Sequence, residues 1–202
     1  MSDTDTYPVR LTIDYPEKMD RVTTLVRLIT VLPILVILGL ASGWVATDSG
    51  GQNLVGLLYI AVALMIIFCQ RYPRWWFDFI RELARFTGRV FCYLLLLTDR
   101  YPSTVDEQSY HLEIDYPDVK SDLNRWMPLI KWLLALPHYV ILVFLGVATI
   151  IVTIVAWFAI LITGSYPRPL FDFTVGVFRW SARVMGYAFW LVTDQYPPFR
   201  MT

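Results

Sequence analysis

Two short segments of the chain alternate between apolar and polar residues. Residues 8–15 and residues 110–116 each place apolar side chains at about every second position. Period-two alternation is typical of a half-buried strand. The two strands are expected to pair with each other as a small sheet on the cytoplasmic face, although pairing with strands of a neighbouring protomer is the open alternative.

Long apolar stretches follow each predicted strand. Residues 25–69 contain two apolar runs around a polar turn at residues 47–53, whereas residues 128–163 form one nearly continuous run. Because a helix of about 20 apolar residues crosses a bilayer, the first stretch predicts a helical hairpin that spans or re-enters the membrane. The second stretch predicts a similar hairpin around Gly146, or one long tilted helix preceded by an interfacial stretch.

Each half of the chain then carries a predicted amphipathic helix, at residues 74–97 and 168–192. Charged residues recur there at helical spacing among aromatic and aliphatic residues, which gives each helix a polar stripe. A helix of this kind lies on the membrane as a surface helix in the interface. The alternative is a further crossing with its arginines paired inside, but charge at bilayer depth is costly.

These elements recur because the two halves share ordered sequence matches. Leu-x-Ile-Asp-Tyr-Pro at residues 11–16 recurs at residues 112–117, and each half closes on Thr-Asp-x-Tyr-Pro. So many matches in the same order are not expected by chance, and they predict a tandem repeat of strand, hairpin and amphipathic helix. The predicted units are residues 1–102, a linker at residues 103–109, and residues 110–202.

Composition and charge agree with a membrane protein. Hydrophobic residues make up 56 % of the 202 residues, which is above the apolar share of a typical soluble domain. The formal net charge is zero, so nothing suggests a nucleic-acid partner. All seventeen lysines and arginines lie outside the predicted hairpin tips. The positive-inside rule then places both termini and both amphipathic helices in the cytoplasm.

Five residues are candidates for structural roles. Asp78 and Asp172 are expected in the first turn of the amphipathic helices, where a carboxylate complements the helix dipole. Pro33 and Pro137 occupy matched positions in the first hairpin helix and are expected to kink it. His138 stands at the membrane boundary, where an interfacial or helix-capping role is favoured over ligation of a metal or haem.

Four arginines at matched positions are the candidate contacts for lipid headgroups or a partner: Arg85, Arg89, Arg179 and Arg183. Near an anionic membrane each would contribute about 1 kcal/mol, and an ordinary solvated or ion-paired helix face is the equal alternative. The sequence has no Gly-rich phosphate loop, Ser-His-Asp set or Cys-His metal spacing. We therefore predict no catalytic residue, no metal site and no cofactor.

Four segments of the second half form a recognisable pattern, at residues 134–139, 157–168, 170–173 and 193–199. With this pattern the second half resembles a bacterial membrane family catalogued as domain of unknown function 4389. The first half departs from the family pattern, with Ile34 and Leu35 at the positions of His138 and Tyr139. The resemblance implies a multi-pass protein of the bacterial inner membrane and no assigned activity.

Three functions are compatible with these features. The first is a non-catalytic membrane subunit that self-associates or joins a larger membrane complex. The second is a protein that binds anionic lipid or remodels the membrane. A small transporter or channel ranks last, because the two repeats have the same orientation and not the inverted one common in transporters. The expected partners are membrane lipids and a homo-oligomer or larger membrane complex.

Overall fold

The computed structural model describes residues 7–41, 54–104, 106 and 108–202. The protein is mainly helical with one small antiparallel sheet, as the apolar periodicity predicts. The predicted polar turn at residues 47–53 lies outside the described residues. The elements in chain order are β1 (Val9–Ile13), α1 (Arg21–Ala41), α2 (Leu54–Leu64), a π-helical turn η2 (Met65–Cys69), α3 (Arg74–Leu94), β2 (Tyr110–Ile114), α4 (Val119–Asp122), α5 (Pro128–Leu134), α6 (Leu136–Thr163) and α7 (Arg168–Ala188).

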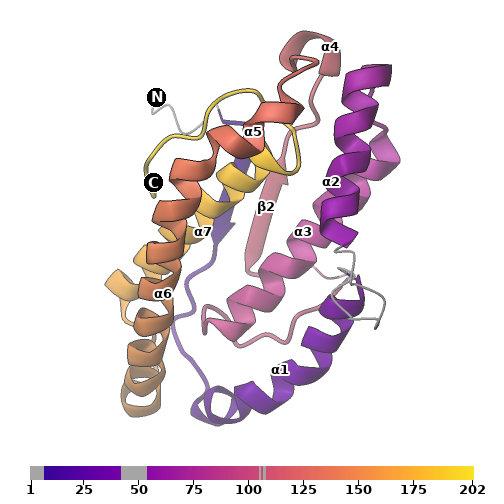
Figure 1. Ribbon diagram of the computed structural model, residues 1–202. Helices are drawn as coiled ribbons and strands as arrows, with labels where there is room; N and C mark the ends of the chain where they lie inside the picture. The colour runs from indigo at the N-terminus through magenta and orange to yellow at the C-terminus, as the bar shows by residue number, and fades with distance from the viewer. Residues whose placement is uncertain (1–6, 42–53, 105, 107) are drawn as a thin grey trace, which may run out of the picture.

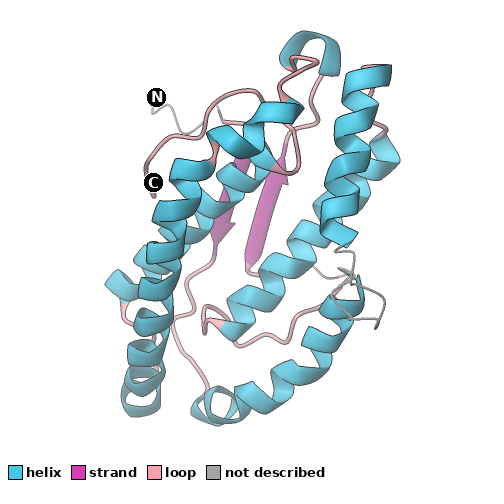
Figure 2. Ribbon diagram, in the orientation of Figure 1, coloured by secondary structure: helices cyan, strands magenta, loops and turns pink. Residues whose placement is uncertain are grey.

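The elements form three layers (Figures 1 and 2). The sheet is the first layer, and the two amphipathic helices α3 and α7 pack behind it. In the third layer, α1 packs on α3, and α6 packs on α7. The strand of each half contacts the amphipathic helix of the other half, since β1 packs on α7 and β2 packs on α3. The sheet therefore ties the two halves of the chain together.

The sheet contains the two predicted strands paired with each other. The strands run antiparallel and Leu11 lies opposite Leu112 at the centre. The apolar residues of both strands are buried against α3 and α7, whereas Arg10 and Glu113 face outward as a cross-strand pair. Period-two alternation was therefore a correct guide to the buried face.

Both amphipathic helices end earlier than predicted, at Leu94 and Ala188. A residue with left-handed backbone follows each of them, Leu96 with φ 66° and Leu191 with φ 56°. Glycine usually occupies this position after a helix, because a side chain is strained there. Both leucines are nonetheless almost fully buried, so apolar burial offsets the backbone strain and fixes the point where each helix stops.

The second hairpin prediction is wrong. Helix α6 runs unbroken from Leu136 to Thr163, and Gly146 lies inside it without a turn. The alternative prediction, one long helix preceded by a short interfacial stretch, describes α5 and α6. Residues 138–163 contain no proline, asparagine or aspartate to start a turn, and a single glycine costs a helix only about 1 kcal/mol.

The matched prolines Pro33 and Pro137 act differently: Pro33 lies in a helix that bends, and Pro137 lies where one helix ends and the next begins. Helix α1 bends by 54° between Arg21–Arg27 and Ile29–Leu40. The bend adjoins Ile29, whose carbonyl faces the ring of Pro33 one turn later. Pro137 lies in the first turn of α6 and not in the interior of a helix, so the predicted kink at Pro137 is wrong. Its missing N–H separates α5 from α6, because it cannot continue the hydrogen-bond ladder.

Candidate functional site

Helix α6 exposes apolar side chains along its whole length. Phe144 is 70 % exposed, Phe158 is 55 % and Ile162 is 75 %. Only 11 % of its most apolar 18-residue window is buried inside the protein. A helix that is apolar all round normally lies in a protein core or in a membrane. Burial by the described residues does not account for the apolar surface of α6.

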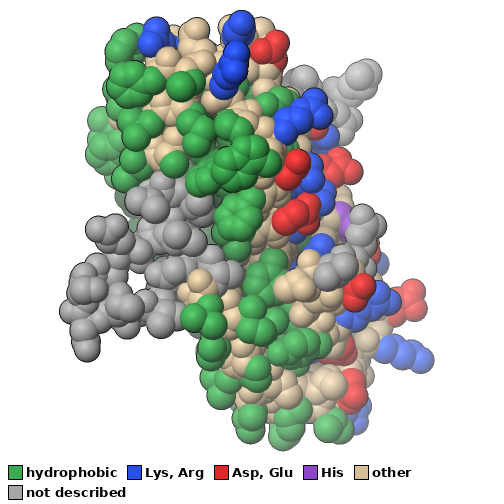
Figure 3. Space-filling model, turned by 90° about the vertical axis from the view of Figure 1, so that its right-hand side faces the viewer, with side chains coloured by type: hydrophobic (Ala, Val, Ile, Leu, Met, Phe, Trp, Pro, Cys, Tyr) green, Lys and Arg blue, Asp and Glu red, His purple; other side chains and the backbone are tan. Residues whose placement is uncertain are grey.

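Neighbouring helices extend this apolar surface. Helix α1 adds Leu25, Ile29, Leu32, Val36 and Leu40, and α2 with η2 adds Ile60, Leu64 and Phe68. We call the exposed apolar side chains of α1, α2, η2 and α6 the apolar surface. Figure 3 shows hydrophobic side chains gathered over one side of the molecule, with acidic and basic side chains along one edge. Exposed patches of this extent mark membrane or protein contacts.

The outer face of the sheet is charged and lies on the opposite side of the molecule from the apolar surface. Arg10 forms ion pairs with Glu113 at 3.2 Å and with Asp115 at 2.8 Å. His111 contacts Asp14 across the same sheet at 3.1 Å. These pairs are exposed, so each contributes little to stability. Charged side chains therefore lie on the outer face of the sheet, and exposed apolar side chains lie on α6 at the opposite side of the molecule.

Arg85 and Arg179 bind the edges of the sheet. The Nε atom of Arg85 donates to the carbonyl oxygen of Leu112 at 3.0 Å, and Nε of Arg179 donates to Leu11 at 2.9 Å. Each arginine therefore donates a hydrogen bond to a carbonyl on the open edge of a strand, and that strand belongs to the other half of the chain. An open edge is a template for unwanted pairing, so these two side chains have a structural role that the sequence did not reveal.

Arg89 and Arg183 bind chain segments that follow the ends of α3 and α7. Arg89 donates to the carbonyl oxygen of Ser103 at 2.9 Å, and Arg183 donates to Arg200 and to Thr202. Both side chains are buried. Burial, together with the nearby Arg200, lowers the pKa of Arg183. Contact with lipid headgroups stays a prediction for the four arginines, all of which already bind backbone carbonyls.

Two buried cations at matched positions were not singled out from the sequence. Lys131 Nζ lies 2.7 Å from Asp194 Oδ1 and donates to the carbonyl oxygen of Thr193 at 2.7 Å. Arg27 forms the corresponding ion pair with Asp99. Lys131 and Arg27 are 1 % and 2 % exposed as side chains. The repeated Thr-Asp-x-Tyr-Pro motif supplies both carboxylates, and its aspartate was the available signal.

Each carboxylate also holds the start of a distant segment. Asp99 accepts a hydrogen bond from the backbone N–H of Asp20 at 2.7 Å, and Asp194 accepts from that of Asn124 at 2.5 Å. The ring of a tyrosine lies near each cation, at 4.5 Å from Arg27 and at 5.4 Å from Lys131. Each site joins the end of an amphipathic helix to the beginning of an apolar stretch.

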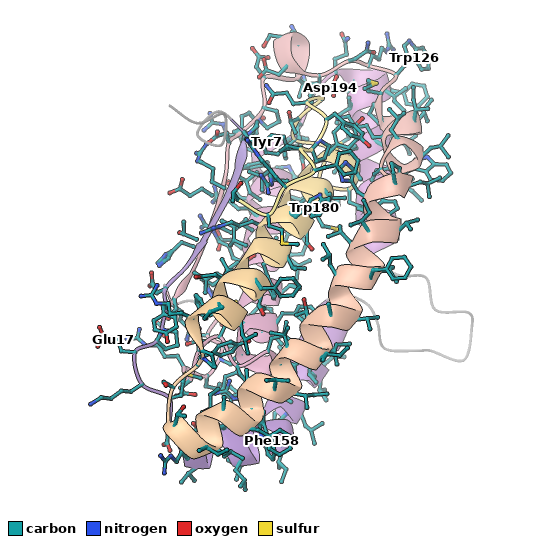
Figure 4. The ribbon with its side chains drawn as sticks, turned by 90° about the vertical axis from the view of Figure 1, so that its left-hand side faces the viewer. Tyr7, Glu17, Trp126, Phe158, Trp180 and Asp194 are labelled. Carbon is teal, nitrogen blue, oxygen red and sulfur yellow. The ribbon has the colours of Figure 1, made fainter. Side chains whose placement is uncertain are left out.

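His138 lies in an aromatic cluster with Trp180, Tyr196 and Phe199 (Trp180 is labelled in Figure 4). It is fully buried, and its Nδ1 accepts a hydrogen bond from the Trp180 indole at 3.0 Å. A neutral imidazole then carries its proton on Nε2, which makes that nitrogen unsuitable as a metal ligand. The side chain is buried and bonds to Trp180 and not to the backbone at the start of α6, so it is not a helix cap, and the interfacial role stays a prediction.

Asp78 and Asp172 do not lie where the sequence predicts. Helices α3 and α7 begin at Arg74 and Arg168 and have no acidic residue in the first turn. Both carboxylates fall in the second turn, where the helix dipole is weak. Asp78 instead pairs with Arg81 at 3.1 Å. Among the residues that the structure describes, Asp172 is exposed and has no ion pair.

Helix α7 also differs from the predicted surface helix. It is covered by β1 on one side and by α6 on the other, and its exposed residues, Arg168, Pro169 and Asp172, all lie near its start. Two glycines permit this close packing. A Cβ atom on Gly186 would lie 2.6 Å from Val9, and one on Gly176 would lie 2.7 Å from Met201. Helix α3 keeps an exposed face that includes Trp75 and Phe79.

The fold and these contacts define a mainly helical protein with a small sheet and a large exposed apolar surface. Within the described residues, no group of three or more His, Cys, Asp or Glu side chains is placed to hold a metal. Residues 125–200 match the model of a domain of unknown function, DUF4389. The predicted resemblance is therefore confirmed over most of the second half of the chain. No curated protein and no solved structure matches.

Proposed function

We propose that the protein is a non-catalytic, multi-pass membrane protein that associates with itself or serves as an accessory subunit of a bacterial membrane complex. The exposure of α6 carries this proposal. Its 28 residues span about 42 Å at about 1.5 Å per residue. The hydrocarbon core of a bilayer is about 30 Å thick, so α6 is long enough to cross with a tilt.

The environment of α6 favours a membrane over the core of a soluble protein. A core helix is mostly buried by its own chain, whereas α6 turns most of its apolar side chains outward. Among the described residues α6 is the one helix that is long and apolar enough to cross by itself, and the bent α1 qualifies if its two parts are one span. The proposed multi-pass arrangement uses both helices.

The charge distribution supports the proposed orientation. Ion pairs lie on the outer face of the sheet, and Arg85 and Arg179 of the amphipathic helices donate to carbonyls of that sheet. With α6 in the bilayer, this charged side would face the cytoplasm together with both termini, in agreement with the positive-inside rule. The arginine contacts with backbone carbonyls give less support to a protein that grips anionic lipid.

Self-association is the proposed use of part of the apolar surface. Gly146 interrupts the bulky side chains of α6, and a Cβ built on it would meet no atom within 4 Å. Small residues allow two helices to approach closely in a membrane. The neighbouring Val143 and Val147 are 65 % and 55 % exposed, so they are available to pack beside the gap left by Gly146.

The test is the mass of the protein after extraction in a mild detergent and after transfer to lipid nanodiscs. Light scattering should give a protein mass of at least two chains of 23.5 kDa, or the chain together with other membrane subunits. Gly146→Leu should reduce self-association, whereas the matched control Val155→Leu on the same helix should not. A single chain of unaltered mass in both media, for wild type and variants alike, would refute the proposal.

A further inference from the structure

A cavity of about 320 Å³ lies between α3 and α7 under the sheet. Its walls are aromatic and aliphatic side chains from both helices, with Tyr110 of β2 and Tyr59 of α2 completing the enclosure. The two helices pack on different strands, and the space between their facing sides is not filled by the protein. Representative lining residues are Ile80, Leu83, Phe91, Phe178, Met185 and Phe189.

Besides the hydroxyls of Tyr59 and Tyr110 and the indole of Trp190, two aliphatic hydroxyl groups are the polar part of this lining. Thr87 of α3 and Ser181 of α7 occupy matched positions in the two halves and both line the cavity. Neither side chain has a hydrogen-bond partner among the described residues, whereas the hydroxyl of Tyr59 donates to the Pro128 carbonyl. A hydroxyl that is half-buried among apolar groups gains from a partner. Thr87 and Ser181 are therefore free to bind an acceptor on a ligand.

The cavity opens to the outside through an apolar rim. Phe91 lines the cavity and is 43 % exposed, so an aromatic ring forms part of the opening. The volume suits a single chain. A methylene group is similar in size to a water molecule, which occupies about 30 Å³ in the liquid, so the cavity has room for about ten chain carbons and not for two chains.

We propose that this cavity binds one fatty acyl chain, with a carboxyl or ester oxygen accepting hydrogen bonds from Thr87 and Ser181. The apolar walls provide the burial that a hydrocarbon chain gains on leaving water. The paired hydroxyls provide the few polar contacts that orient a ligand in an apolar pocket. The proposed membrane location matters here only because a membrane would supply the acyl chain. Binding of that chain to the purified protein depends on the cavity alone.

Photocrosslinking of the full chain in detergent micelles tests the proposal. One probe is a decanoic acid analogue with a diazirine on its chain, and the second is a phospholipid that carries the same acyl chain. Crosslinked peptides are mapped by mass spectrometry, with unlabelled decanoate as competitor. We expect peptides from residues 80–91 and 178–190, and the more efficient probe identifies a free acid or an esterified chain as the source.

Variants separate the cavity from general contact with detergent-embedded surfaces. Thr87→Leu with Ser181→Leu fills the cavity and should weaken labelling about tenfold or more, the order expected when methylene-sized groups block an apolar pocket. Thr12→Leu on the exposed outer face of the sheet is the control and should label as wild type does. Thr87→Val with Ser181→Ala removes both hydroxyls at nearly constant volume and should weaken labelling by the acid.

Two results would overturn the proposal. One is crosslinking confined to peptides of α1 and α6, which would show only lipid around the apolar surface. The other is undiminished, competitor-resistant labelling of the filled cavity variant. Should that variant fail to fold, the crosslink map of the wild type and the hydroxyl-free variant decide the question. Mass and membrane insertion of the protein are measured separately, so a failed acyl-chain site leaves the proposed membrane function testable by itself.

Discussion

Replacing Lys131 by methionine should destabilise the fold strongly. The Lys131 side chain is 1 % exposed and that of its partner Asp194 is 22 % exposed. Methionine keeps the apolar stem of lysine but removes the charge, so the Asp194 carboxylate loses its cation. It retains the hydrogen bond from the backbone N–H of Asn124. The change therefore removes the ion pair together with the hydrogen bond that Lys131 donates to the Thr193 carbonyl.

The expected cost is about 3 kcal/mol. Removing one partner of a buried ion pair costs about 3–5 kcal/mol, and the partial exposure of Asp194 favours the lower end. The lost hydrogen bond to the Thr193 carbonyl is part of that figure. Adding Asp194→Asn should recover part of the stability, because the buried charge is then gone, with a coupling energy of about 2 kcal/mol in the double-mutant cycle.

Reversible unfolding in mixed micelles, followed by far-UV circular dichroism, measures these differences. Arg10→Met is the matched control, since its pairs on the outer face of the sheet are exposed and worth about 0–1 kcal/mol. Arg27→Met should behave like Lys131→Met, because Arg27 pairs with Asp99 in the same way. A loss below about 1 kcal/mol for Lys131→Met, or additive effects in the cycle, would refute the reasoning.

Three further predictions follow from particular contacts. Arg85→Ala and Arg179→Ala should each cost about 1 kcal/mol through the lost strand-edge hydrogen bond, and equal unfolding midpoints for variants and wild type would contradict this. Gly88→Ala should lower the free energy of unfolding by about 1–3 kcal/mol, because the added Cβ would lie 2.1 Å from the Tyr110 ring. Adding Tyr110→Leu should relieve this clash and restore part of the stability. A double variant that is no more stable than Gly88→Ala in the unfolding titration would argue against the clash. Maleimide at mildly alkaline pH should label the exposed Cys69 and spare the buried Cys92. Burial raises the pKa of the Cys92 thiol above its usual range, so this thiol stays protonated and unreactive at that pH. Rapid labelling of Cys92 in the native protein would contradict the packing of α3.

The sequence predicted the elements that have a clear period. The two strands and the start of both amphipathic helices at Arg74 and Arg168 follow from alternation and from the Tyr-Pro-Arg motif. Residues 128–163 have no such internal signal, because a continuous apolar run is compatible with one helix or two. The analogy with the first half favoured a hairpin, and only the structure distinguishes the long helix α6.

The roles of the charged residues were not predictable in the same way. The matches between the two halves grouped Arg85 with Arg179, but the partners of these arginines are carbonyls of Leu112 and Leu11 on distant strands. Such contacts depend on which strand packs on which helix, and periodicity contains no information about that. The tandem repeat itself stays a prediction, although matched residues make matched contacts in both halves.

The most direct test of the central claim is the depth of α6 in a lipid bilayer. The native cysteines are changed to serine, and a nitroxide label is attached at a single new cysteine that replaces Val140, Val147 or Phe158. In liposomes, the collision rate of each label with oxygen is compared with its collision rate with a water-soluble nickel chelate. Oxygen should dominate at all three positions and most strongly at Val147, whereas a label at Thr12 on the outer face of the sheet should collide mainly with nickel. Nickel-dominated collisions along α6 would contradict the account.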